Sequence, residues 1–145
     1  RISRHACSEM HAWVAESRDA AGPDVETGGL LFGERDEAAG VIWVTEAGGP
    51  PPDSRASAKE FICGVTGTAE AHGTRKARSR GAVQYVGMWH THPDSLPIPS
   101  ATDWLGMQSL VAAAGGANQS LLLIIGRHLN TRMVGAYVFR SRDFL

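Results

Sequence analysis

Residues 89–103 read WHTHPDSLPIPSATD, and this stretch sets the organisation of the whole chain. The apolar run at 83–90 leads into it and predicts a strand. The amphipathic segment at 101–114 follows it and predicts a helix, which Gly115 and Gly116 end. A buried strand therefore runs through two histidines into a proline-rich loop and then into a helix. Polar side chains from all three kinds of local structure come from one short length of chain.

The segments outside this stretch alternate between helical and extended patterns. The first is a helix at 3–19 with Ser3 as its N-cap. The other predicted segments are, in chain order, strands 28–33 and 41–45 with a turn at 34–37, a weaker strand 57–62, a polar helix 65–80, and strands 121–125 and 133–140. The run at 121–125 is apolar at every position, which is typical of a strand buried on both faces. On the helix at 101–114, the expected core face carries Trp104, Met107, Leu110 and Val111. Interleaved helices and strands of this kind define a mixed α/β domain.

The composition is that of an ordinary globular domain. The chain has 145 residues, 43% of them apolar and 20% charged, which is enough for one domain with its own core. The net charge of −1 gives no electrostatic footprint for nucleic acid or an anionic membrane, and no apolar run is long enough to span a bilayer. The two cysteines, Cys7 and Cys63, are not spaced as a metal-binding pair. We expect both to be small buried thiols in a protein of the reducing cytoplasm.

Two histidines at the end of the predicted strand are candidate metal ligands. Side chains at i and i+2 of a strand point to the same face, so His90 and His92 can reach one ion. Asp103, in the first turn of the following helix, can supply an oxygen. Two imidazoles and one carboxylate leave the fourth position of a tetrahedral zinc open for water, which is the arrangement of a catalytic site. We therefore expect one zinc per chain.

Simpler explanations exist for each part of this pattern. Ser100 and Asp103 are spaced as a capping box, with the serine as N-cap and the aspartate in place of the usual glutamate. A lone His-x-His is more often incidental than metal-binding. The two features adjoin, however, and Pro93, Pro97 and Pro99 stiffen the loop between them. Such rigidity suits a site that must hold its ligands in place without the metal's help.

A zinc-bound water also needs a general base. Glu26 is the best placed carboxylate, because it directly precedes Thr27-Gly28-Gly29 and the strand that follows. Glycines at these positions let two backbones approach closely. Considered alone, Glu26 would be taken for an ordinary loop carboxylate.

Together these residues resemble the JAMM signature of the JAB/MPN+ zinc metallopeptidases. The family's pattern is a Glu, then His-Ser/Thr-His, seven residues, Ser, two residues and Asp. The chain matches it at Glu26, at His90-Thr91-His92 and at Ser100-x-x-Asp103. The order of the flanking segments fits as well, so the resemblance covers essentially the whole chain. It implies one JAB/JAMM metallopeptidase domain over residues 1–145, with a mixed α/β fold in which helices flank a central, mostly antiparallel sheet, similar to the fold of cytidine deaminases.

The resemblance also implies a role for each matched residue. His90, His92 and Asp103 would bind zinc. Glu26 would take a proton from the zinc-bound water and pass it to the leaving amine. Ser100 would donate a hydrogen bond to the oxyanion of the intermediate. The capping function is compatible with these roles, because the same residues can begin the helix and serve the site.

The activity that the resemblance implies is hydrolysis of a peptide or isopeptide bond after the C-terminal tail of ubiquitin or a ubiquitin-like protein. The reaction would either reverse conjugation or mature a precursor. The Glu-Thr-Gly-Gly and Trp-His-Thr-His-Pro segments are similar to those of bacterial members encoded beside activating-like and conjugating-like enzymes, including antiviral conjugation systems. The expected partners are therefore a ubiquitin-like protein or its conjugates, together with such enzymes.

Three other functions can be compared with this one. A non-catalytic MPN scaffold would have lost the metal ligands, which are all present here. A JAMM metallopeptidase for another substrate, such as a sulfur-carrier precursor or a phage-tail or cell-wall peptide, keeps the same residues and stays open. A zinc nucleobase deaminase needs His-x-Glu and Pro-Cys-x-x-Cys, and the chain has neither.

Overall fold

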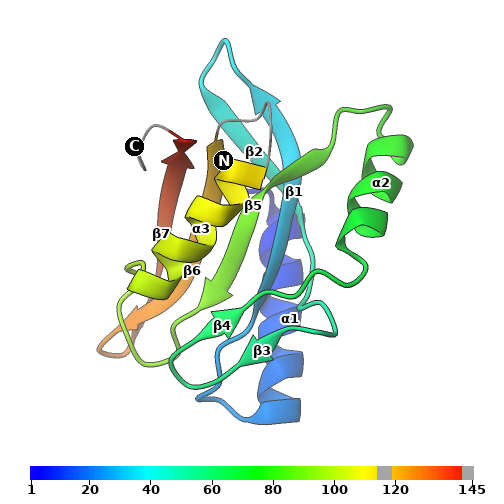
Figure 1. Ribbon diagram of the computed structural model, residues 1–145. Coiled ribbons are helices and arrows are strands. Elements are labelled where there is room, and N and C mark those ends of the chain that lie inside the picture. The colour runs from blue at the N-terminus through cyan, green and yellow to red at the C-terminus, as the bar shows by residue number, and fades with distance from the viewer. Residues whose placement is uncertain (114–118, 142–145) are drawn as a thin grey trace.

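The structure is a computed structural model that describes residues 1–113 and 119–141. Its elements in chain order are α1 (Arg4–Ala21), β1 (Gly28–Asp36), β2 (Val41–Ala47), β3 (Arg55–Ala56), β4 (Phe61–Ile62), α2 (Thr68–Arg78), β5 (Gln84–Thr91), α3 (Ala101–Ala113), β6 (Gln119–His128) and β7 (Thr131–Arg140) (Figure 1). The predicted helix stop at Gly115 and Gly116 lies outside the described residues.

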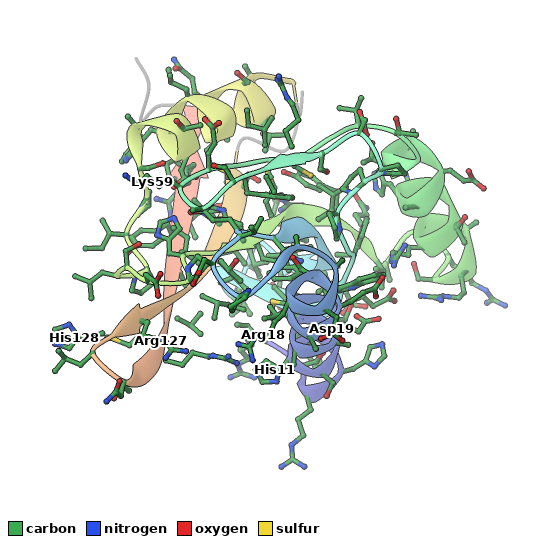
Figure 2. All side chains as sticks on the ribbon, turned by 90° about the horizontal axis from the view of Figure 1, so that it is seen from below. His11, Arg18, Asp19, Lys59, Arg127 and His128 are labelled. Atoms are coloured by element: carbon green, nitrogen blue, oxygen red, sulfur yellow. The ribbon has the colours of Figure 1, made fainter. Side chains whose placement is uncertain are left out.

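A five-stranded sheet in the order β2-β1-β5-β6-β7 forms the centre of the molecule. Strands β5 and β6 are parallel, whereas the other three neighbouring pairs are antiparallel. Helix α3 is the connection between the two parallel strands, as such a pair requires. Figure 2 views the molecule from below and shows α1 and α3 on opposite sides of the sheet. The expected mixed α/β fold, with a mostly antiparallel sheet flanked by helices, is confirmed.

Strand β6 carries the core on both of its faces. Leu121, Leu123 and Ile125 pack in one cluster with residues of α1, and Leu122 and Ile124 pack in the other with residues of α3. Successive side chains of a strand point to opposite faces, so an uninterrupted apolar run serves both clusters at once. The predicted burial of the run at 121–125 on both faces is therefore confirmed.

Helix α1 begins after the predicted N-cap and runs two residues past its predicted end at 19, to Ala21. Ser3 Oγ accepts a hydrogen bond from the amide of Ala6 at 3.0 Å, which is an N-cap. Gly22 ends the helix with φ of 95°, in the left-handed region that favours glycine. In the described residues, no helix is both long enough and apolar enough to cross a membrane.

The predicted hairpin of β1 and β2 is confirmed. The predicted position of its turn at 34–37 is wrong, because β1 continues to Asp36 and pairs there with Val41 of β2. The chain reverses at 37–40 instead. Asp36 Oδ1 accepts a hydrogen bond from the Ala39 amide at 2.9 Å, and Gly40 takes a φ of 64°. The Asp36 side-chain hydrogen bond and the positive φ of Gly40 set the position of the reversal. The charged residues before it extend strand β1.

The predicted strand at 57–62 is also wrong. The chain forms two very short strands instead, and Arg55 pairs with Ile62 while Ala56 pairs with Phe61. The polar residues between them make a turn in which the Ser57 amide donates to the Glu60 carbonyl at 2.9 Å. Their polarity favours a solvated turn over a continuous strand.

Helix α3 buries fewer residues than its pattern predicts. Met107 and Val111 are buried and Leu110 is partly buried, but 47% of Trp104 is exposed. The Trp104 ring meets the edge of Phe139, with ring centroids 4.8 Å apart, at the rim of the core. Both cysteines are free, and each is only partly buried.

Candidate metal centre

Strand β5 positions two histidines between two neighbouring strands. His90 pairs with Gly28 of β1 on one side and with Ile124 of β6 on the other. The His92 amide continues the parallel ladder by donating to the Ile125 carbonyl at 2.8 Å. The exposed fractions of His90 and His92 are only 2% and 8%. The backbone that carries both imidazoles is therefore fixed by hydrogen bonds from each side.

Glycine at position 28 allows β1 to lie directly against the His90 backbone. A Cβ atom at Gly28 would come within 2.2 Å of the Trp89 carbonyl oxygen and 2.8 Å of the His90 Cβ. Any side chain there would push β1 away from β5. The close approach brings Glu26, two residues before Gly28, to the end of β5.

Hydrogen bonds hold the chain on both sides of the Glu26 side chain. The Glu26 amide donates to the Ser57 carbonyl at 2.9 Å. The Thr27 amide donates to Thr91 Oγ1 at 2.9 Å, and the Thr91 amide donates to the Thr27 carbonyl at 2.8 Å. Thr91 is buried and points to the opposite face of the strand from the two histidines. The strand that carries the histidines therefore also fixes the position of Glu26.

The proline-rich loop lies on the β6–β7 hairpin. Pro97 is buried, and its carbonyl accepts a hydrogen bond from the Tyr137 hydroxyl at 2.6 Å. The Arg127 amide donates to the Ser95 carbonyl at 2.7 Å. Gly126 makes room for this contact, because a Cβ there would come within 2.5 Å of the Pro97 nitrogen. The loop is thus anchored between the histidines and α3.

The polar atoms of three side chains converge where β5 ends and α3 begins. The two Nε2 atoms of His90 and His92 are 3.1 Å apart. Asp103 Oδ1 lies 3.3 Å from the His90 Nε2, and Asp103 Oδ2 lies 3.6 Å from the His92 Nε2. The structure therefore brings together the three residues that the sequence analysis takes as metal ligands.

Hydrogen bonds orient the His92 ring and keep the Asp103 carboxylate ionised. His92 Nδ1 lies 2.9 Å from the Leu96 carbonyl oxygen, which can only accept, so a neutral ring carries its proton on Nδ1 and leaves the Nε2 lone pair free. A hydrogen bond donated to the Asp103 carboxylate stabilises the protonated ring and raises the pKa of His92, against the effect of burial. Burial opposes ionisation of Asp103, but hydrogen bonds from both histidines outweigh it and hold its pKa well below the usual range. The carboxylate is therefore charged and ready to bind a cation.

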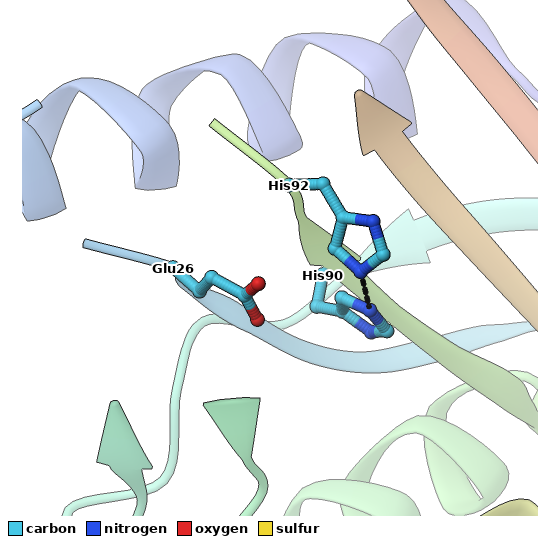
Figure 3. A group of neighbouring side chains, drawn as sticks. All are labelled: Glu26, His90 and His92. Atoms are coloured by element: carbon cyan, nitrogen blue, oxygen red, sulfur yellow. Dashed lines mark hydrogen bonds between the residues drawn. The ribbon is translucent and has the colours of Figure 1, made fainter. Parts of the chain in front are cut away.

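Glu26 lies beside these donor atoms. Figure 3 shows its carboxylate directed towards the two imidazoles. One oxygen of Glu26 and one ring nitrogen of each histidine all lie within 4.8 Å of one another, and this buried group could hold a metal ion. Burial raises the pKa of Glu26 to about 7, and the nearby His92 charge acts in the opposite direction. A carboxyl group with such a pKa can both accept and release a proton near neutral pH.

Ser100 and Asp103 form the capping box that their spacing indicates. The amide and the hydroxyl of Ser100 donate to Asp103 Oδ2 at 2.7 and 2.9 Å. The Asp103 amide returns a hydrogen bond to Ser100 Oγ at 3.2 Å. The box uses Oδ2 and leaves Oδ1 towards His90, so capping is compatible with a ligand function of the same carboxylate.

Two grooves meet at this centre. The first, of about 730 Å³, lies among α2, α3 and one face of the sheet, and His90 and Asp103 are part of its lining. Its walls are mostly apolar, with Phe61, Val65 and Leu105 among them. The second, of about 740 Å³, is lined by Glu26, His92 and Ser100 together with the proline-rich loop. A chain entering either groove would therefore reach the same cluster of polar atoms.

Sequence reasoning missed Thr91 and the Leu96 carbonyl. Thr91 stands between the two histidines but faces away from them, and only its buried pairing with Thr27 shows what it does. A threonine at such a position is equally typical of any strand. The Leu96 contact depends on how the loop folds back onto His92. The family pattern requires Ser or Thr at position 91 but gives no role for its hydroxyl, and the Leu96 contact has no sequence signal of its own.

The geometry defines a domain with a buried candidate metal centre at one end of a mixed sheet. Residues 5–141 match the family of prokaryotic homologues of the JAB domain, and the chain belongs to that family. The resemblance found in the sequence is thereby confirmed.

Two relatives are similar to parts of the chain, and each is named "CD-NTase/cGAS isopeptidase". The protein from Enterobacter hormaechei subsp. hoffmannii is 38% identical over 87 residues, which are 60% of this chain and 47% of the relative. The protein from Vibrio cholerae serotype O1 is 34% identical over 107 residues, which are 70% of this chain and 62% of the relative. The chain thus spans about half to three fifths of these relatives.

A solution structure of a protein from Desulfitobacterium hafniense shares the fold. It has a TM-score of 0.58 at 21% identity, and the match covers 97% of this chain and 84% of that one. At this level of identity, the similarity shows the arrangement of helices and strands alone.

Proposed function

We propose that the domain is a zinc-dependent isopeptidase that hydrolyses the bond after the C-terminal tail of a ubiquitin-like protein. The observation that carries the proposal is the convergence of His90, His92 and Asp103 beside the buried Glu26. The donor separations of 3.1, 3.3 and 3.6 Å support zinc as the metal. Ligands about 2.0 Å from a tetrahedral zinc lie roughly 3.3 Å from one another.

The chain's own residues supply the remaining chemistry. Zinc held by His90, His92 and Asp103 would provide Lewis-acid activation of the water and of the scissile carbonyl. Glu26 takes a proton from the attacking water, whose oxygen bonds to the carbonyl carbon. As the carbon–nitrogen bond breaks, Glu26 delivers that proton to the leaving amine. Ser100 Oγ–H turns from Asp103 towards the developing oxyanion and donates a hydrogen bond to it.

The two grooves support a substrate that enters from both sides of the centre. The apolar groove whose lining includes His90 and Asp103 suits an extended, mostly apolar tail. The groove lined by Glu26 and Ser100 would hold the amine-bearing side of the bond, because the leaving amine must reach Glu26. This division puts the proton donor on the leaving-group side.

The relatives' name adds a second candidate for the tail. Two proteins called CD-NTase/cGAS isopeptidase match this chain. Their name supports an alternative substrate, in which the tail before the cleaved isopeptide bond belongs to a CD-NTase/cGAS-type protein. Either substrate fits a bacterial conjugation system with activating-like and conjugating-like enzymes, an antiviral system among them. The two free cysteines support a reducing cytoplasm as the location.

A cleavage assay tests the proposal. The purified chain with zinc is incubated with fusions that carry a ubiquitin-like tail or a CD-NTase/cGAS-type tail before the scissile bond. Separate samples contain a sulfur-carrier precursor or a cell-wall peptide. Glu26→Gln protein serves as the matched control. Cleavage directly after one of the tails, absent from the control, is the expected result. Cleavage only of a sulfur-carrier precursor or a cell-wall peptide would assign the other substrate class, and no hydrolysis of any of them would reject the catalytic function.

A further inference from the structure

Two arginines lie directly opposite each other at the end of the β6–β7 hairpin. Arg127 of β6 and Arg132 of β7 are cross-strand partners in the antiparallel ladder. Directly opposed residues project from the same face of a sheet, and like charges in this relationship repel. Both side chains are exposed, so water and salt screen much of the repulsion. An anion between them would remove the rest.

A third arginine completes the arrangement. Arg18, in the last turn of α1, lines the same cavity as Arg127 and Arg132, and the cavity volume is about 60 Å³. Figure 2 shows Arg18 and Arg127 at the same edge of the molecule. The cavity lining contains three arginines and neither Asp nor Glu. Within residues 1–113 and 119–141, none of the three forms an ion pair.

The C-terminal end of α1 accounts for only part of this charge. Its free carbonyl groups carry a partial negative charge, which favours a cation such as Arg18 in the last turn. That partial charge cannot balance three guanidinium groups. A site with several guanidinium forks and no carboxylate of its own is suited to an oxyanion, which each fork can bind through two parallel hydrogen bonds.

We propose that this cavity, which we call the arginine cavity, binds an oxyanion group: a phosphate or a carboxylate. Its volume of about 60 Å³ is enough for the charged group itself and not for a nucleoside or a peptide. The remainder of a larger ligand would lie outside. Arg127 and His92 line both the arginine cavity and the Glu26 groove, so the bound group would lie next to the candidate centre. The proposal does not depend on the hydrolytic function.

Thermal unfolding tests the arginine cavity with simple probes. The melting temperature of the zinc-loaded chain is measured in sodium phosphate and in sodium acetate, each against sodium chloride of equal ionic strength. At ten times its dissociation constant, a bound anion should raise the melting temperature by about 4 °C. A larger rise in phosphate assigns a phosphate group, and a larger rise in acetate assigns a carboxylate.

Variants separate the arginine cavity from the metal and from general charge effects. Arg127→Gln and Arg132→Gln should each lose most of the rise in melting temperature, because each removes one guanidinium group from the cavity. Both positions are exposed, so the fold should tolerate the change. Arg4→Gln, an exposed position in the first turn of α1, should keep it. An anion bound to the zinc would raise the melting temperature equally in all variants, and that result would overturn the proposal. The absence of any rise in the unmodified chain, with either anion, would also overturn it.

Discussion

Thr91 Oγ1 accepts a hydrogen bond from the Thr27 amide at 2.9 Å, and this contact couples the strand of the histidines to Glu26. The donor is buried, so removing its acceptor leaves an unpaired amide next to the proposed base. Thr91 faces away from the two histidines and lines neither of the two grooves at the centre, so it acts through Thr27. It is a positioning residue.

Replacing Thr91 should therefore affect turnover and stability while sparing the metal. We expect Thr91→Val to lower kcat about tenfold and to lower the free energy of unfolding by about 1–3 kcal/mol, because the Thr27 amide loses its partner. Thr91→Ser keeps the hydroxyl and should stay close to the unmodified chain. Kinetics and zinc content of both variants provide the measurement. Equal kcat values for the Val and Ser variants would show that Thr91 only fills space.

Metal content is the most direct check of the centre. Protein that has never been exposed to chelators should carry about one zinc per chain, measured by elemental analysis. His92→Ala should lose most of it, because two donors remain of the three. His128→Ala removes a histidine from an exposed position at the end of β6 and should change nothing. Retention of full zinc by the His92 variant would place the metal elsewhere.

Glu26 should be needed for hydrolysis and not for zinc. Glu26→Gln replaces the carboxylate with an amide of the same shape that cannot take a proton, so turnover should fall by at least a hundredfold. Zinc content and melting temperature should stay the same or improve, since the buried charge is removed. If the variant loses its zinc instead, Glu26 is a ligand.

Ser100 allows the capping function and the oxyanion function to be separated. Ser100→Ala should cost about 1 kcal/mol of stability, whereas Ser100→Gly should cost only a few tenths, because glycine is tolerated at an N-cap. Both remove the hydroxyl, so both should lower turnover about a hundredfold. Ser100→Asp would not be a suitable control, because its carboxylate would lie next to Asp103 Oδ2 and the two negative charges would repel. Turnover that follows stability across the two variants would mean that Ser100 only begins the helix.

Cys63 should react slowly despite being free. Burial raises the pKa of its thiol to about 11, with the Asp53 charge acting in the same direction. At pH 8 the thiolate fraction is then about two orders of magnitude below that of an ordinary cysteine. Iodoacetamide labelling of a Cys7→Ser variant, followed by mass spectrometry, should show slow labelling when folded and fast labelling in denaturant. The folded rate should rise with pH up to about 11, and a fast, pH-independent folded rate would contradict the burial.

The sequence predicts the fold class well because its strongest signals come from the core. The apolar run at 121–125 can bury both of its faces only as a central strand with a helix on each side of the sheet. Errors occur where few apolar residues contribute. Local polar contacts set the turn after β1 and the paired strands β3 and β4. The exposure of Trp104 follows from its place at the edge of the core.

The candidate site divides in the same way. His90, His92 and Asp103 are close in sequence, so spacing alone suggests that they meet. Glu26 reaches them only through the β1–β5 ladder, and its assignment needed a family pattern. The pairing of Arg127 with Arg132 beside Arg18 has no sequence pattern, because it depends on how α1 packs on the sheet.

The closeness of the three donor residues along the chain has a consequence for the order of assembly. His90, His92 and Asp103 are joined by one proline-stiffened loop, and closing a short, stiff segment requires little loss of chain entropy. The β1–β5 ladder joins residues as far apart as Gly28 and His90, so its closure is slower and costs more. If the proposed function holds, a nascent or partly unfolded chain would bind the metal before Glu26 reaches the site. Metal loading and the acquisition of activity would then be separate events, and the bound ion would guide the late docking of the first strand.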